Sequence, residues 1–178
     1  MAEVLTAVPG SRLLLKSRAL SDSEVCQSIR ARFETLAVAP ERVVCHGFLP
    51  DPQDHLNLYN DADVALDTFP YNGTATTCDA LWMGLPIVTL EGSAHAARVG
   101  ASLLRSAGLA RLIGRDEGEY SRIAVELASN LPALSELRRS MRGKLLASPL
   151  TDVRGFVRTL ETAFCEMKKQ SDHMVSDS

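Results

Sequence analysis

Residues 62–86, ADVALDTFPYNGTATTCDALWMGLP, decide the fold of this chain of 178 residues. The apolar run at residues 63–67 is typical of a buried strand, and the loop after it is rich in turn-forming residues. The spacing of residues 74–84 then predicts a helix, and residues 86–90 form another apolar strand. A strand, a helix and a strand in this order predict a parallel sheet covered by helices.

The same alternation extends to both sides of this segment. Further strands are expected at residues 12–16, 42–46 and 111–114, and further helices at residues 21–36, 51–60 and 94–108. The helix at residues 21–36 is expected to start with a capping box formed by Ser21 and Glu24. After Gly114 the pattern is helical only, at residues 117–130, 131–147 and 152–169. The fold class is therefore α/β, a Rossmann-like parallel sheet with flanking helices, followed by C-terminal helices.

The first residues look like the end of a helix. Glu3, Val4, Leu5 and Val8 have helical spacing and lead into a turn at residues 9–10, whereas a parallel α/β unit normally begins with a strand. We therefore expect a first strand and most of a helix to lie upstream of this chain. Residues 1–169 are expected to form one incomplete lobe, and the polar residues 170–178 are expected to be a disordered tail.

Composition excludes several classes of protein. With 19 basic and 22 acidic residues, the net charge of -3 gives no electrostatic reason to expect binding to nucleic acid or to an anionic membrane. No stretch approaches the roughly 18 apolar residues of a spanning helix, and the start lacks the features of a signal peptide. Four separated cysteines indicate reduced thiols in the cytoplasm. The histidines lack ligand spacing, so neither a metal nor another cofactor is expected.

The loop from Gly73 to Thr76 is the strongest candidate binding site. At the start of a helix, the first N–H groups lack intrahelical partners and the helix dipole is positive, so Gly73, Thr74, Ala75 and Thr76 are suited to hold a phosphate. Asp79 lies three residues after Thr76 on the same face, where its carboxylate could accept hydrogen bonds from ribose hydroxyls. Together these features fit a nucleoside diphosphate, and the alternative is a plain capped helix.

Two further residues are expected at the carboxyl ends of strands, where open α/β sheets bind ligands. His55 follows the strand at residues 42–46 and could stack on a base or contact a phosphate; the alternative is a neutral surface histidine. Lys16 closes the first strand at the same edge, where it could offer charge to a phosphate. The alternative for Lys16 is a solvated lysine.

Several blocks of sequence together resemble a known family. They are residues 8–20 (VPGSRLLLKSRAL), 62–73 (ADVALDTFPYNG), 79–89 (DALWMGLPIVT), 97–104 (ARVGASLL) and 148–150 (SPL). In this order they resemble the C-terminal catalytic lobe of the O-GlcNAc transferase and SPINDLY family, particularly its bacterial members that carry tetratricopeptide repeats. The resemblance covers nearly the whole chain.

The resemblance implies the C-terminal, donor-binding lobe of a GT-B glycosyltransferase, incomplete here. The family is inverting and transfers GlcNAc from UDP-GlcNAc, or fucose from GDP-fucose, to serine or threonine hydroxyls of proteins. By resemblance, the loop from Asn72 to Thr76 holds the pyrophosphate and Asp79 the ribose, while His55 and the turn ending at Pro50 hold the base. Stabilising the leaving group in such a transferase requires a cation, and Lys16 is the one possible catalytic residue of this chain. The N-terminal lobe and the protein-binding repeats, through which a protein acceptor would bind, are outside this chain, so the chain alone is expected to be inactive.

Several positions depart from the family pattern and keep other hypotheses open. Pro52 and Leu58 stand where animal members have lysine and arginine, and Ala75 replaces a threonine of the phosphate loop. These substitutions favour, as the alternative, a non-catalytic nucleotide-binding or interaction module derived from the lobe. A gene remnant without function is the third hypothesis.

Overall fold

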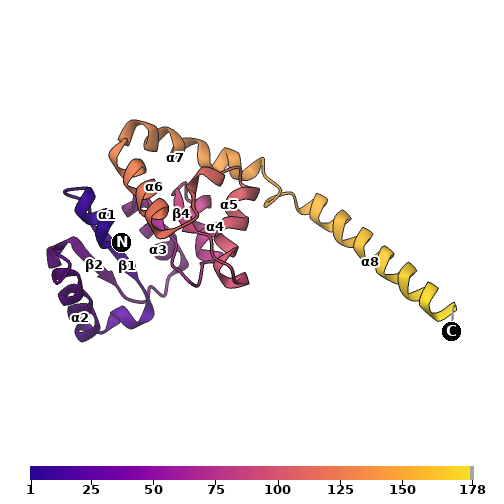
Figure 1. Ribbon diagram of the computed structural model, residues 1–178, viewed down its shortest axis with the longest axis horizontal. Coiled ribbons are helices and arrows are strands. Elements are labelled where there is room, and N and C mark those ends of the chain that lie inside the picture. Colours follow the sequence, from indigo (N-terminus) through magenta and orange to yellow (C-terminus); the bar gives the residue numbers. More distant parts are fainter. Residues whose placement is uncertain (177–178) are drawn as a thin grey trace.

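The computed structural model describes the backbone of residues 1–176 and the side chains of residues 1–170. It confirms an α/β fold with parallel strands and flanking helices (Figure 1). The strands are β1 (Leu13–Lys16), β2 (Val43–His46), β3 (Ala65–Leu66), β4 (Ile87–Leu90) and β5 (Ile113–Gly114). The α-helices are α1 (Ala2–Ala7), α2 (Ser23–Glu34), α3 (Pro52–Asn57), α4 (Ala75–Trp82), α5 (Val99–Ser106), α6 (Glu117–Ser129), α7 (Leu131–Leu146) and α8 (Val153–Ser176). None of the helices in the described part of the chain is long and apolar enough to cross a membrane.

The strands form two parallel sheets, where the sequence predicted one. β1 pairs with β2, and β4 lies between β3 and β5. Within the described residues no ladder joins β1 to β3. Helix α1 links the two halves instead, because Val4 belongs to the core under β3–β5 whereas Leu5 belongs to the small core beside β1 and β2. The guanidinium of Arg42 fixes this helix by donating to the carbonyl oxygens of Leu5 and Val8 at 2.6 and 3.2 Å.

The larger core explains why the three-stranded sheet is well defined. Val88 and Leu104 are fully buried between β4 and α5, and Tyr120 of α6 packs from the other side. Helix α7 covers α4 and α6 and adds Met141 to the same core. These positions recur at strand and helix periods, which is why the sequence predicted the elements correctly.

The ends of the helices differ in detail from the sequence prediction. The expected capping box of Ser21 and Glu24 is wrong, because α2 begins at Ser23 and its N-cap is Asp22, which accepts a hydrogen bond from the Glu24 N–H at 2.8 Å. The Ser21 hydroxyl instead accepts from the Phe48 N–H at 3.2 Å. Since Asp22 is the residue directly before the helix, its carboxylate reaches the free N–H groups first.

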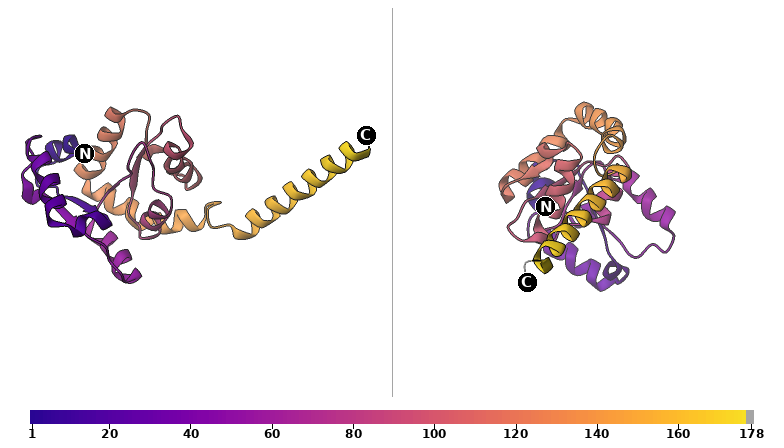
Figure 2. Two further views of the ribbon diagram at one scale, coloured as in Figure 1. Left: turned by 90° about the horizontal axis from the view of Figure 1, so that it is seen from below. Right: turned by 90° about the vertical axis from the view of Figure 1, so that its right-hand side faces the viewer.

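Helix α8 projects away from the rest of the molecule, as Figure 1 and the left view of Figure 2 show. It continues beyond the expected end near Lys169, and residues 177–178 of the expected tail lie outside the described residues. An apolar stripe at spacings of three and four residues runs along it and is exposed; its residues are Val153, Val157, Leu160, Phe164 and Met167. Such a stripe is typical of a helix that packs against another surface.

Candidate functional site

Three residues from different parts of the chain meet at the carboxyl ends of the strands. Lys16 ends β1, His55 lies in α3 after β2, and Asp79 lies in α4 after β3. The Lys16 ammonium contacts Nδ1 of His55, and Nε2 of the same ring lies 3.8 Å from a carboxylate oxygen of Asp79. The fold therefore brings together a cation, an imidazole and a carboxylate that are up to 63 residues apart in the sequence (79 minus 16).

The contacts of His55 favour one arrangement of its protons. Because the lysine ammonium is a donor only, Nδ1 of His55 must accept, and the proton of the neutral ring then lies on Nε2, on the side of Asp79. The side chains of His55 and Asp79 are 29% and 38% exposed, so this edge of the site is open to a ligand.

Tyr59 belongs to the same site, and the sequence analysis missed it. Its ring meets the His55 ring edge to face, with centroids 5.4 Å apart, and its hydroxyl lies 3.5 Å from the carbonyl oxygen of Thr76. Burial, with a further contribution from the charge of Asp79, raises the pKa of Tyr59 to about 12. The signal in the sequence was its position four residues after His55, which places both rings on one face of a helix.

The first turn of α4 is exposed, as it must be if it is to bind a phosphate. Thr74 is the N-cap residue, and no side chain of the described chain caps this helix. Thr74, Ala75 and Thr76 are all exposed, so the unpaired N–H groups of the first turn face no covering element. An anion at this position would be stabilised by these N–H groups and by the helix dipole.

Two residues of the loop before α4 that were predicted at the ligand have hydrogen-bond partners inside the protein. The Gly73 N–H, predicted to hold a phosphate, donates to the Asp67 carboxylate at 2.8 Å. Asn72, predicted to contact the ligand, is 2% exposed, and its side chain donates to the Thr68 carbonyl at 3.0 Å and accepts from the Gly100 N–H at 3.3 Å. Both groups are used inside the loop, because a buried polar group needs an internal partner.

The turn before α3 lies on the same edge as His55. Pro50 is exposed and precedes Asp51, the N-cap of α3, whose carboxylate accepts from the Gln53 N–H at 2.8 Å. In the same turn, the exposed Phe48 ring has the Arg18 guanidinium 4.9 Å above its centroid. The predicted role of Pro50 beside a base stays a prediction.

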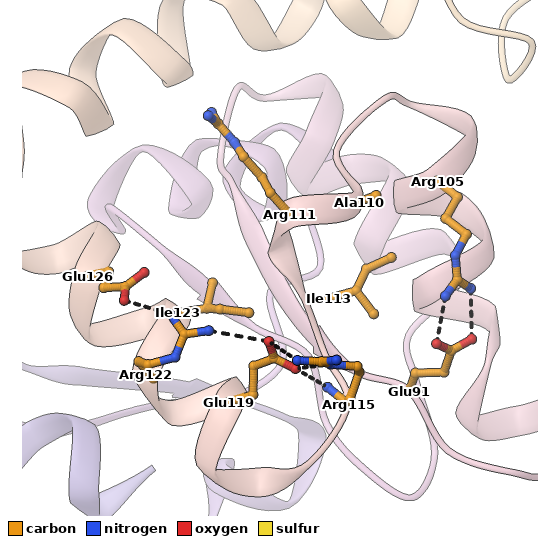
Figure 3. A pocket seen from close by; sticks show the side chains of 10 residues that line it. All are labelled: Glu91, Arg105, Ala110, Arg111, Ile113, Arg115, Glu119, Arg122, Ile123 and Glu126. Carbon is orange, nitrogen blue, oxygen red and sulfur yellow. Dashed lines mark hydrogen bonds and ion pairs between the residues drawn. The ribbon is translucent and has the colours of Figure 1, made fainter.

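A second hollow lies at the far side of the larger sheet, beyond β5 (Figure 3). This cavity of about 340 Å³ is lined mainly by charged side chains that pair with one another. Glu91 pairs with Arg105, and Glu119 pairs with both Arg115 and Arg122. Hydrogen bonds from Arg115 lower the pKa of Glu119 to about 2. Apart from Arg111, which has no ion-pair partner among the described residues, the charged side chains of this lining already pair with one another.

Comparison with known proteins points to one family. The family model described as Glycosyl transferase family 41 matches residues 1–160. The chain is 43% identical over 166 residues to a rice protein named "Probable UDP-N-acetylglucosamine--peptide N-acetylglucosaminyltransferase SPINDLY", which covers 93% of the chain. It is 34% identical over 170 residues to the Arabidopsis thaliana protein of the same descriptive name called SEC, which covers 92% of it.

A solved structure agrees with these relatives. A mutant O-GlcNAc transferase from Thermobaculum terrenum matches 93% of this chain with a TM-score of 0.87 and 42% identity. The match covers 32% of that chain. The chain likewise spans about 18% of the length of the SPINDLY relatives.

Proposed function

The chain belongs to glycosyl transferase family 41, and from this premise we propose that it is the nucleotide-sugar-binding lobe of an inverting protein O-glycosyltransferase. The observation that carries the proposal is the meeting of Lys16, His55 and Asp79 beside the uncapped start of α4. A cation, an anion-binding helix start and a carboxylate match the diphosphate and the ribose of a nucleotide.

We propose UDP-GlcNAc as the donor substrate, with GDP-fucose as the second candidate, and serine or threonine hydroxyls of a protein as the acceptor. The names of the SPINDLY and SEC relatives support UDP-GlcNAc. In this role Asp79 binds the ribose, His55 and Pro50 face the base, and the first turn of α4 holds the diphosphate. No metal is needed, because Lys16 and the helix start supply the positive charge.

The proposed chemistry is a direct displacement at the anomeric carbon of the sugar. The acceptor hydroxyl oxygen forms a bond to that carbon and releases its proton to water. The bond from the carbon to the diphosphate oxygen breaks, and its electron pair leaves with the diphosphate, so negative charge develops there. The free N–H groups of Ala75 and Thr76 and the ammonium of Lys16 would stabilise this charge. Because they are already in place before the reaction, they would favour the transition state over the ground state.

The alternative of a non-catalytic module is the weaker hypothesis. It rests on Pro52, Leu58 and Ala75, whereas relatives that match over the same 166 residues are named as transferases. Of these positions, Ala75 lies in the proposed diphosphate contact, where the backbone N–H binds whatever the side chain is. The location we propose is cytoplasmic, which fits four cysteines without a disulfide in the described chain.

Calorimetric titration of UDP, GDP and pyrophosphate tests the site. Asp79→Ala should weaken UDP and GDP but leave pyrophosphate nearly unchanged, because the carboxylate serves the ribose and would repel phosphate. Gly73→Val should weaken all three ligands, because a Cβ at Gly73 would overlap the Thr76 hydroxyl and lie 3.2 Å from the Thr77 hydroxyl. These contacts would displace the first turn of α4.

Matched controls separate local from general effects. Asp61→Ala removes an exposed carboxylate just after α3, and Gly143→Val adds the same side chain on α7, where a Cβ would meet nothing within 4 Å. Both controls should bind all three ligands like the wild type. Equal loss of pyrophosphate and UDP in Asp79→Ala, or unchanged binding in Gly73→Val, would show that the site lies elsewhere.

A further inference from the structure

Asp67 lies directly beneath the proposed diphosphate site and is fixed in the fold by its backbone. It follows β3, and its N–H donates to the Val88 carbonyl at 2.9 Å. Its own carbonyl accepts from the hydroxyl of buried Tyr120 at 2.9 Å. The residue is only 4% exposed, so it cannot itself contact a bound nucleotide.

Both oxygens of the Asp67 carboxylate have partners in the interior. One accepts from the Gly73 N–H at 2.8 Å, and the other accepts from the hydroxyl of Thr89, which is fully buried on β4, at 2.7 Å. Gly100 of α5 packs against this pair so closely that a Cβ there would overlap both side chains. The carboxylate thus links β3, β4 and α5 to the loop before α4.

Gly73 is held from two sides as a result. Its N–H is bound by Asp67, and its carbonyl accepts from the Thr77 hydroxyl at 2.9 Å. Because both backbone polar groups of Gly73 are hydrogen-bonded, the direction in which the chain enters α4 is fixed. The hydrogen bonds of Gly73 to Asp67 and Thr77 therefore orient the free N–H groups in the first turn of α4.

We propose that Asp67 is a positioning residue for the nucleotide diphosphate: through Gly73 it sets the direction of the first turn of α4. This inference rests on the proposed function of the α4 site. The role is assigned to the hydrogen bond and not to the charge, because a buried negative charge near a diphosphate repels it. Burial raises the pKa of Asp67, against the hydrogen bonds from Gly73 and Thr89, which lower it.

Two substitutions separate the hydrogen bond from the charge. Asparagine at position 67 can still accept from the Gly73 N–H, while its amide donates to the Thr89 hydroxyl, which is able to accept. Asp67→Asn should therefore bind UDP and pyrophosphate within about threefold of the wild type. Asp67→Ala removes the acceptor, so the first turn of α4 loses its fixed direction and both ligands should bind at least about tenfold more weakly.

Thr89→Val is the control for general damage beneath the site. It removes the partner of the second carboxylate oxygen and leaves the Gly73 contact, so it should lower thermal stability but weaken UDP by less than about threefold. Titrations are made at a temperature at which circular dichroism shows each variant to be folded. If Thr89→Val weakens UDP as much as Asp67→Ala does, or if folded Asp67→Ala binds like the wild type, the proposed role is wrong.

An NMR measurement tests the inference without any ligand. In the wild type, the Gly73 amide proton should shift as Asp67 is titrated with acid, and in Asp67→Asn this shift should disappear. The amide signals of Ala75 and Thr76 should move in Asp67→Ala but not in Thr89→Val. If the wild type binds no nucleotide but these signals behave as expected, the proposed function fails while the link from Asp67 to α4 stands. A Gly73 signal that does not respond to Asp67 overturns the link, even if Asp67→Ala does not fold.

Discussion

Replacing Lys16 with methionine tests the charge that is proposed to face the diphosphate. Methionine keeps an unbranched side chain of similar length but cannot donate a hydrogen bond. A hydrogen bond from a charged donor to phosphate contributes roughly 1.5 to 3 kcal/mol. The ammonium has three N–H donors, so it can keep its contact with Nδ1 of His55 while it donates to the phosphate. The expected effect of Lys16→Met is therefore about 1.5 to 3 kcal/mol, or about 10- to 150-fold weaker binding of UDP.

Calorimetric titration of UDP, pyrophosphate and uridine measures this effect, with Lys144→Met on α7 as the matched control. UDP and pyrophosphate should weaken in Lys16→Met and uridine should not, because uridine carries no phosphate. The difference between wild type and variant should shrink at high salt, since the half-buried lysine is partly screened. Equal weakening of uridine would show that Lys16 acts through His55, and unchanged UDP binding would refute the reasoning.

Three further outcomes are expected. The purified chain should transfer no sugar from UDP-GlcNAc or GDP-fucose to a peptide, because the donor-binding lobe alone cannot place two substrates together; measurable turnover would contradict this. Asp79→Asn should lower the pKa of Tyr59 from its value of about 12, because the Asp79 charge helps to raise it. Ultraviolet difference titration against Tyr59→Phe measures this pKa, and an unchanged value would place the two groups further apart. Finally, the apolar stripe of α8 should make the chain self-associate, and Leu160→Glu with Phe164→Glu should reduce the mass found by sedimentation; a wild-type monomer at high concentration would argue against this.

The order and type of the secondary-structure elements follow from the sequence alone. Strand and helix periods depend on neighbours a few residues apart, so apolar runs and helical spacing were sufficient to predict all five strands and the helices after them. The same local information placed Lys16 at the end of a strand and Asp79 one turn into a helix. Both positions follow from chain direction in a parallel sheet, which explains why the candidate site could be assembled in outline.

Which polar groups of the loop before α4 are used internally, and which are left open, depends on contacts between distant segments. The Gly73 N–H and the Asn72 side chain were expected at the ligand, but they bind Asp67 and the Gly100 N–H. Asp67 itself gave no local signal, because its partner Thr89 is 22 residues away on another strand. The division into two sheets likewise depends on which strands pair with each other in the folded chain. Such hydrogen-bond partners are brought together by packing between distant segments, so they cannot be predicted from the periodicity of residues along the chain.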